Sequence, residues 1–292
     1  MKLASFRIQN RTSIGAVLDD DILDLPAAQP SLPADMIEFL RGGELALAMA
    51  RAAPRAPAHL HRLADVELLA PVPRPQKYLA IGFNFQSHID ELRRVVPVMK
   101  DFKPPVVPVF FNKQVTCVQR PYGTIELPKV SSQLDYEVEL IAVIGKRCRH
   151  VAQEQALDVV AGYCVGNDVS VRDWQIASPT MMMGKSFDTH GPIGPWITTR
   201  DEIAPGRSLA METRVNGELR QSGSTGEMLH TLAGQIEYLS AAFTLEVGDL
   251  IATGTPAGVG LLMVPPQFLR AGDVVRCQIE GLGHIENTVR TE

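Results

Sequence analysis

The first 70 residues of the chain combine alternating segments with helical ones. Residues 2–9 and 13–18 alternate polar and apolar side chains with a period of two, which predicts two strands joined by a polar turn. Residues 35–41 and 44–53 predict two helices broken by a pair of glycines. The proline-rich stretch 71–75 predicts a stiff, extended linker. We therefore expect two domains: a small α/β N-terminal domain, residues 1–72, and a larger domain, residues 73–292.

Strands dominate the pattern after the linker. Short apolar segments bounded by Gly, Pro or polar clusters predict strands at residues 78–81, 109–111, 134–144, 163–169, 193–198, 211–215, 250–253 and 274–279. Helices are predicted at residues 86–94, 153–161 and 228–243. These helices do not alternate regularly with the strands, which argues against a doubly wound parallel sheet. We expect an α+β fold with a mixed or antiparallel sheet in the larger domain.

Composition limits the classes of partner. Of 292 residues, 45% are hydrophobic and 21% charged, which is ordinary for a globular protein and excludes disorder. The net charge of -5 argues against nucleic acid or an anionic membrane as partner. No apolar run approaches the roughly 18 residues of a membrane helix, and the start lacks the apolar core of a signal peptide. The four cysteines are widely spaced, as free thiols in a reducing cytoplasm are, so we expect a cytoplasmic protein.

Acidic side chains in the segment 134–144 carry the strongest chemical signal. In a continuous strand Asp135, Glu137 and Glu139 share one face, and the apolar run that follows indicates a buried strand. Buried carboxylates cost several kcal/mol each unless a cation compensates them. An edge strand with a solvated acidic face is the alternative. Oxygen-only ligands indicate a hard cation, Mg²⁺ first, with Mn²⁺ or Ca²⁺ able to substitute.

Two further residues extend this candidate site. Asp168 ends an apolar strand and is the best third carboxylate, although Asn167-Asp168 alone is more typical of a turn. Lys185 lies among Met, Gly and Phe in a segment flanked by apolar strands. A partly buried lysine near carboxylates stays charged and can hold an anionic substrate or an enolate.

A histidine and a glutamate offer acid–base chemistry. His88 and Glu91 are three residues apart on a predicted helix and therefore share one face. A carboxylate beside an imidazole orients it as a general base needs, although such a pair is also common on helix surfaces. The proline-rich loop that follows predicts a lid, residues 83–105. A strand and glycine-rich loop at residues 248–260 offer the Thr255 hydroxyl, in a stretch that alone would be a tight turn.

Together these segments resemble the fumarylacetoacetate hydrolase family. The matching segments are residues 82–91, 108–113, 135–145, 161–175, 184–195, 215–217 and 248–260. The resemblance implies a mixed β-sheet roll or barrel as catalytic domain, usually in a homodimer. It implies metal ligands at Glu137, Glu139 and Asp168, catalytic residues at Lys185, His88 and Glu91, and substrate-binding residues at Gln175 and Thr255. Phe85 departs from the family, because many relatives carry Tyr there.

Members of this family cleave or rearrange 2-oxo acids that carry a second carbonyl. The leading hypothesis is Mg²⁺-dependent hydrolysis of a carbon–carbon bond in an acylpyruvate-like 2,4-dioxo acid, which releases pyruvate and a carboxylic acid. His88 with Glu91 would activate water, while Mg²⁺ and Lys185 would stabilise the departing enolate. Decarboxylation of oxaloacetate, or isomerisation or dehydration of a related 2-oxo acid, is the alternative. A non-catalytic protein that binds 2-oxo acids is a remote third, because the chain keeps the dyad and the lysine.

Overall fold

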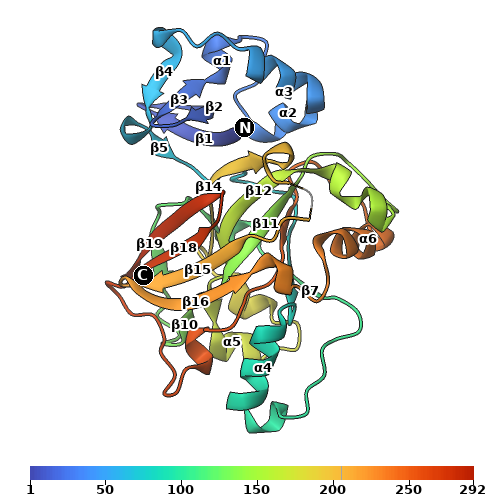
Figure 1. Ribbon diagram of the computed structural model, residues 1–292. Helices are drawn as coiled ribbons and strands as arrows, with labels where there is room; N and C mark the ends of the chain where they lie inside the picture. Colours follow the sequence, from blue (N-terminus) through green and yellow to red (C-terminus); the bar gives the residue numbers. More distant parts are fainter. Residues whose placement is uncertain (205) are drawn as a thin grey trace.

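One large mixed sheet runs through the computed structural model, which describes residues 1–204 and 206–292 (Figure 1). In spatial order its main strands are β4 (Leu60–Arg62), β3 (Asp21–Asp24), β2 (Arg11–Leu18), β1 (Lys2–Ile8), β14 (Gly191–Thr199), β12 (Val160–Asn167), β11 (Val138–Ile144), β17 (Leu250–Ala252), β6 (Tyr78–Gly82) and β7 (Val109–Lys113). Two short strands join it at the side, β5 (Glu67–Leu68) on β1 and β8 (Val118–Gln119) on β14.

A second sheet packs against the large one. Its order is β16 (Glu218–Ser224), β15 (Ala210–Val215), β18 (Val274–Ile279), β19 (Gly283–Thr291) and β9 (Ile125–Leu127). Leu140 and Val165 from the large sheet share an apolar cluster with Val275 and Ile285 from the second. In the described part of the chain, the edge strands β4 and β7 do not pair, so the large sheet is open and no barrel closes. The expected α+β fold with mixed sheets is confirmed, in an open form.

The helices are short and lie outside the sheets. They are α1 (Leu25–Ala28), α2 (Met36–Arg41), α3 (Gly43–Ala52), α4 (Gln86–Val95), α5 (Arg172–Ile176) and α6 (Leu232–Ala242). Short 3₁₀ segments are η1 (Pro57–His59), η2 (Leu63–Asp65), η3 (Pro97–Met99), η4 (Val115–Cys117), η5 (Gln153–Val159), η6 (Met182–Lys185), η7 (Arg200–Glu202), η8 (Thr225–Glu227) and η9 (Gly260–Leu262). Among the described residues, no helix has the length and apolar character to cross a bilayer.

The N-terminal segment, the blue lobe in Figure 1, is joined to the large sheet through its strand β1. β1 pairs antiparallel with β14 through Lys2↔Thr198 and Leu3↔Ile197. Leu3 also belongs to an apolar cluster that includes Phe39 of α2 and Ile141 of β11. The helix α2 begins after Asp35, whose carboxylate accepts the Glu38 N–H at 3.0 Å, as an N-cap does. Whether residues 1–72 fold as a domain of their own stays a prediction.

β11 lies near the middle of the large sheet. It is buried along its whole length and pairs antiparallel with β12 on one side and with β17 on the other. β17 in turn pairs parallel with β6, which leads directly into α4. The start of β11 therefore lies beside the ends of β17 and β6, and the candidate site lies there.

Two predicted elements differ from the structure. The segment 134–144 is not one strand: β10 (Leu134–Asp135) pairs with β13 (Ser170–Val171), and β11 starts only at Val138. Side-chain acceptors take the backbone N–H groups at the break, because Asn167 Oδ1 accepts from Glu137 and Gln221 Oε1 accepts from Val138. The helix predicted at 153–161 is the 3₁₀ segment η5 followed by β12, which begins at a β-branched valine pair.

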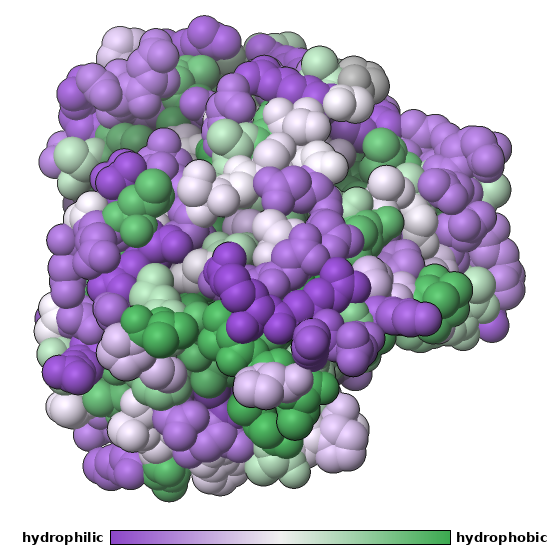
Figure 2. Space-filling view, turned by 60° about the horizontal axis from the view of Figure 1, so that its bottom comes forward, coloured by the Kyte–Doolittle hydropathy of each residue, from purple (hydrophilic) through white to green (hydrophobic). Residues whose placement is uncertain are grey.

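The segment after α4 is irregular, as its prolines predict. Residues 96–108 contain only the turn η3, and Val98, Val106 and Val107 are exposed within it. Figure 2 views this end of the molecule and shows hydrophobic and hydrophilic side chains interspersed over it. Its role as a lid stays a prediction.

Candidate active site

Three carboxylates meet at the start of β11. Oxygens of Glu137, Glu139 and Asp168 all lie within 4.8 Å of one another, and all three side chains are buried. The pairing of β11 with β12 explains this, because Val138↔Asn167 are partners and place Asp168 beside both glutamates. The structure thus brings together the three residues that the sequence suggested as metal ligands.

Two lysines are buried against this cluster. Lys185 Nζ donates to Glu137 Oε2 and to Asp168 Oδ2, both at 2.8 Å. Lys113, at the end of β7, donates to Asp168 Oδ1 and to the carbonyl oxygen of Lys185. Sequence reasoning found Lys185 but missed Lys113. The sequence pattern gives only a weak indication of Lys113, which shares one face of a strand with the apolar Val109 and Phe111.

Charge within the cluster is unevenly compensated. Burial alone would raise the pKa of Glu137, but Lys185 and Arg172 outweigh it, and the resulting pKa is about 2. Burial disfavours the charged form of Lys185, yet Asp168 and Glu137 outweigh it and raise the pKa of its ammonium. Burial, and then Asp168 and Glu137, raise the pKa of Glu139 well above its usual range.

Glu139 therefore lacks a cation of its own. Its Oε2 accepts only the Gly254 N–H, at 2.7 Å, in the described part of the chain. A buried set of carboxylate oxygens with one uncompensated charge matches the donor set of a hard divalent cation. The residues present thus fit such a cation, and Glu137, Glu139 and Asp168 are the ones that would hold it.

Arg172, at the start of α5, is a site residue that sequence reasoning missed. It is buried, and its Nη1 donates to Glu137 Oε1 at 2.6 Å and to Gln175 Oε1 at 2.9 Å. Its Nη2 has no hydrogen-bond partner among the described residues. A guanidinium with a free N–H pair beside a cavity can bind a carboxylate. The available signal was a lone arginine four residues after Asp168.

Asp135 has a different role from the one that strand alternation predicts. Because the strand breaks at residue 136, its carboxylate does not join the other three. It accepts from Arg172 Nε at 2.8 Å and from the backbone N–H groups of Gly260 and Leu261 at 2.8 and 2.9 Å. Asp135 therefore anchors the glycine-rich loop and orients Arg172.

His88 and Glu91 lie on α4 at the edge of the site. His88 Nδ1 and Glu91 Oε2 are 3.7 Å apart, which is too long for a hydrogen bond. Glu91 Oε2 instead accepts the Gly258 N–H at 3.0 Å, which ties α4 to the glycine-rich loop. Phe85 is fully buried in the apolar core and forms a β-bridge with Met228, so this departure from the family pattern lies in the core.

A cavity of about 50 Å³ joins these groups. Six of the eight predicted site residues line it: His88, Glu137, Glu139, Gln175, Lys185 and Thr255. Asp168 and Glu91 lie behind this lining and touch it through Lys185 and the glycine-rich loop. Phe83 also lines the cavity, and its ring packs on Phe102 of the predicted lid with centroids 5.1 Å apart.

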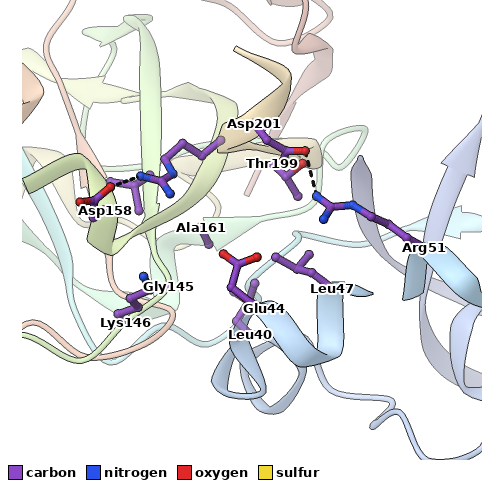
Figure 3. Close-up of a pocket in the computed structure, with 13 residues that line it drawn as sticks. Leu40, Glu44, Leu47, Arg51, Gly145, Lys146, Asp158, Ala161, Thr199 and Asp201 are labelled. Atoms are coloured by element: carbon purple, nitrogen blue, oxygen red, sulfur yellow. Dashed lines mark hydrogen bonds and ion pairs between the residues drawn. The ribbon is translucent and has the colours of Figure 1, made fainter. Parts of the chain in front are cut away.

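A larger cavity, of about 280 Å³, lies between the N-terminal helices and the opposite end of β11 (Figure 3). Glu44 and Leu47 of α3 face Gly145, Ala161 and Thr199 across it. Two ion pairs lie on its rim, Arg51 with Asp201 and Arg200 with Asp158. Gly145 is six residues beyond Glu139, roughly 20 Å along the strand, so this cavity is separate from the carboxylate cluster.

Comparison with known proteins gives consistent matches. A family model described as fumarylacetoacetate (FAA) hydrolase C-terminal matches residues 77–290. Oxaloacetate tautomerase fahd2, mitochondrial, from Xenopus laevis is 41% identical over 295 residues, which cover 99% of this chain and 90% of the relative.

Two solved structures share the fold. Fumarylacetoacetate hydrolase from the psychrophile Exiguobacterium antarcticum is 37% identical with a TM-score of 0.85, and the match covers 100% of both chains. Maleylpyruvate hydrolase from Sphingobium sp. SYK-6, in complex with manganese(II) and pyruvate, is 32% identical with a TM-score of 0.80 over 100% of this chain and 99% of the other. These matches confirm the resemblance seen in the sequence: the chain belongs to the fumarylacetoacetate hydrolase family.

Proposed function

We propose that this protein is a divalent-metal-dependent tautomerase that interconverts the enol and keto forms of a small 2-oxo acid, with oxaloacetate as the first candidate substrate. The observation that carries the proposal is the buried group of Glu137, Glu139, Asp168, Lys185 and Arg172 around a small cavity. The name of the Xenopus laevis relative, an oxaloacetate tautomerase, supports this choice of reaction.

The size and charge of the site favour a small anion. Ligand pockets usually measure roughly 300–1,000 Å³, so a cavity of about 50 Å³ favours a compact acid. Four carboxylates and three cationic side chains form the cluster, namely Asp135, Glu137, Glu139 and Asp168 with Lys113, Arg172 and Lys185. A bound dication would turn this excess of one negative charge into an excess of one positive charge, which attracts an anionic substrate.

Tautomerisation moves one proton between carbon 3 and the oxygen on carbon 2, with no bond cleaved in the carbon skeleton. A divalent cation held by Glu137, Glu139 and Asp168 would supply Lewis acidity that polarises the 2-oxo group. Lys185 keeps its charge and offsets negative charge on that oxygen. Arg172 Nη2 is free to bind a carboxylate of the substrate.

His88 is the best candidate for moving the proton at carbon 3. Its ring lines the cavity, and its Nδ1 has no hydrogen-bond partner among the described residues. Lys185 is excluded from that role in this arrangement, because two carboxylates hold its ammonium protonated. Glu91 lies near enough to steady the imidazole after a small movement of α4.

Hydrolysis of an acylpyruvate-like 2,4-dioxo acid is the second candidate function. The solved maleylpyruvate hydrolase favours it, as does the presence of His88 and Glu91 on one helix face. Hydrolysis needs room for an attacking water and an acyl group besides the 2-oxo acid, so a cavity of about 50 Å³ favours tautomerisation, which needs neither. Decarboxylation of oxaloacetate remains open as a third reaction. The homodimer and the cytoplasmic location stay predictions.

The test separates these reactions by their products. Enol-oxaloacetate is mixed with the protein in chelator, in Mg²⁺ and in Mn²⁺, and loss of enol absorbance is recorded beside release of pyruvate and of carbon dioxide. We expect metal-dependent loss of the enol without pyruvate. Release of pyruvate from oxaloacetate would assign decarboxylation. Release of pyruvate from a panel of acylpyruvates, with the enol lost no faster than without protein, would assign hydrolysis. Either result overturns the proposal.

A further inference from the structure

Gln221 of β16 connects the two halves of the candidate site. It is fully buried, and every polar atom of its amide has partners. Its Oε1 accepts from the Val138 N–H at 3.0 Å and from Thr213 Oγ1 at 2.8 Å. Its Nε2 donates to Thr255 Oγ1 at 2.8 Å and to the Pro256 carbonyl at 2.9 Å.

The chemistry of these partners leaves the amide one orientation. A backbone N–H can only donate, so Val138 must face the amide oxygen. A backbone carbonyl can only accept, so Pro256 must face the NH₂ group. Turning the amide over would set its NH₂ group against the Val138 N–H and its oxygen against the Pro256 carbonyl, at the cost of both of these hydrogen bonds.

This orientation fixes the role of the Thr255 hydroxyl. Because Thr255 Oγ1 accepts from Gln221, its own proton cannot be directed back at that amide. Thr255 lines the cavity, and its Oγ1 has no other hydrogen-bond partner among the described residues. The proton is therefore available to a molecule in the cavity.

We propose that Gln221 is a positioning residue that makes Thr255 a hydrogen-bond donor toward the substrate. The site then takes an acceptor at this point, such as a carboxylate or carbonyl oxygen, and discriminates against an ammonium group, which can only donate. The identity of that ligand as a 2-oxo acid rests on the proposed function. The same amide accepts from the N–H of Val138, the residue between Glu137 and Glu139, so Mg²⁺ is kept saturating for every variant in the test and only the effect through Thr255 is compared.

Affinity for oxalate, a dianion with acceptors only, tests the proposal independently of turnover. Calorimetric titration in Mg²⁺ compares wild type, Q221M, T255V, the Q221M/T255V double variant and T213V. A hydrogen bond to a charged group contributes roughly tenfold or more in affinity, so Q221M and T255V should each weaken oxalate binding at least about tenfold. The double variant should bind no more weakly than T255V alone.

T213V is the matched control, because it removes a hydroxyl from the other end of the same amide. It should lose stability, as Q221M does, and keep oxalate affinity within about twofold. Additive losses in the double variant, or an equal loss in T213V, would overturn the proposal.

A second measurement needs no change at Gln221. If Thr255 is a donor, T255S keeps oxalate affinity and T255V loses it; equal affinity of T255V and wild type overturns the proposal, as does a wild type that does not bind oxalate. If the variants bind oxalate as expected but the protein does not convert the enol, the proposed function is overturned and the role of Gln221 is not.

Discussion

Replacing Asp135 by asparagine tests whether this carboxylate anchors the site. Its Oδ1 accepts from the N–H groups of Tyr136 and Gly260, and its Oδ2 accepts from Arg172 Nε and the Leu261 N–H. All four partners are donors, so an asparagine amide in either orientation turns one NH₂ group against two of them. Two buried donors lose their acceptor in each case.

The cost follows from these two donors. Each buried donor without a partner costs roughly 1–3 kcal/mol, and one of them can be a guanidinium, so we expect D135N to lose about 4 kcal/mol of unfolding free energy. An unfolding entropy of roughly 2.1 cal/mol/K per residue gives about 0.6 kcal/mol/K for this chain. The melting temperature should therefore fall by about 6–7 °C.

Urea unfolding followed by circular dichroism, with thermal melts beside it, measures the loss. D20N is the matched control, because the Asp20 side chain is 85% exposed and its contact with Arg62 is 3.7 Å long. That variant should stay within about 0.5 kcal/mol of wild type. A D135N protein within 1 kcal/mol of wild type, or a D20N protein that loses as much, would refute the anchoring role.

Three further predictions concern single side chains. Burial lowers the pKa of His190 to about 4, so the imidazole stays neutral in the folded state. Because only the unfolded chain binds the proton between pH 6.5 and 4, the unfolding free energy is unaffected above pH 6.5 and falls over that interval. Wild type should lose about 3 kcal/mol more than H190Q over that interval in urea titrations at matched pH, and parallel curves would contradict the assignment. E139Q removes a like charge beside Glu137 and Asp168, so it should melt higher than wild type in chelator and gain less from Mg²⁺; an unchanged Mg²⁺ shift would exclude Glu139 as a ligand. H88N should lower the enol rate about a hundredfold with Mg²⁺ affinity unchanged, and full activity would remove His88 from proton transfer.

The carboxylate cluster could be predicted because it depends on short-range rules. Alternation along a strand places Glu137 and Glu139 together, and Asp168 ends a strand that is a natural neighbour in an antiparallel sheet. The same rule failed at Asp135, because the break after it is stabilised by Asn167 and Gln221, which lie 30 and 83 residues away from the groups they bind. No local pattern contains such contacts.

Lys113 and Arg172 illustrate the other limit. Each is a single charged residue in a segment without a recognisable motif. Whether it reaches the site depends on the order of the strands in the sheet, which decides which strand ends lie side by side. Lys113 reaches Asp168 only because β7 and β12 end at the same side of the site. Sheet order of this kind follows from the packing of the whole core, which the pattern of one segment does not specify.

The pairing of β1 with β14 has a consequence for any shortened form of this protein. β14 is bounded by β12 on one side, and on the other β1 covers its end at Ile197 and Thr198. Removing the N-terminal segment would unpair the backbone of β14 at Ile197 and Thr198 and expose the apolar side chains that Leu3 and Phe39 now cover. Such an edge is a template for intermolecular strand pairing. We therefore expect the N-terminal segment to protect the rest of the chain from aggregation, apart from any part in the chemistry.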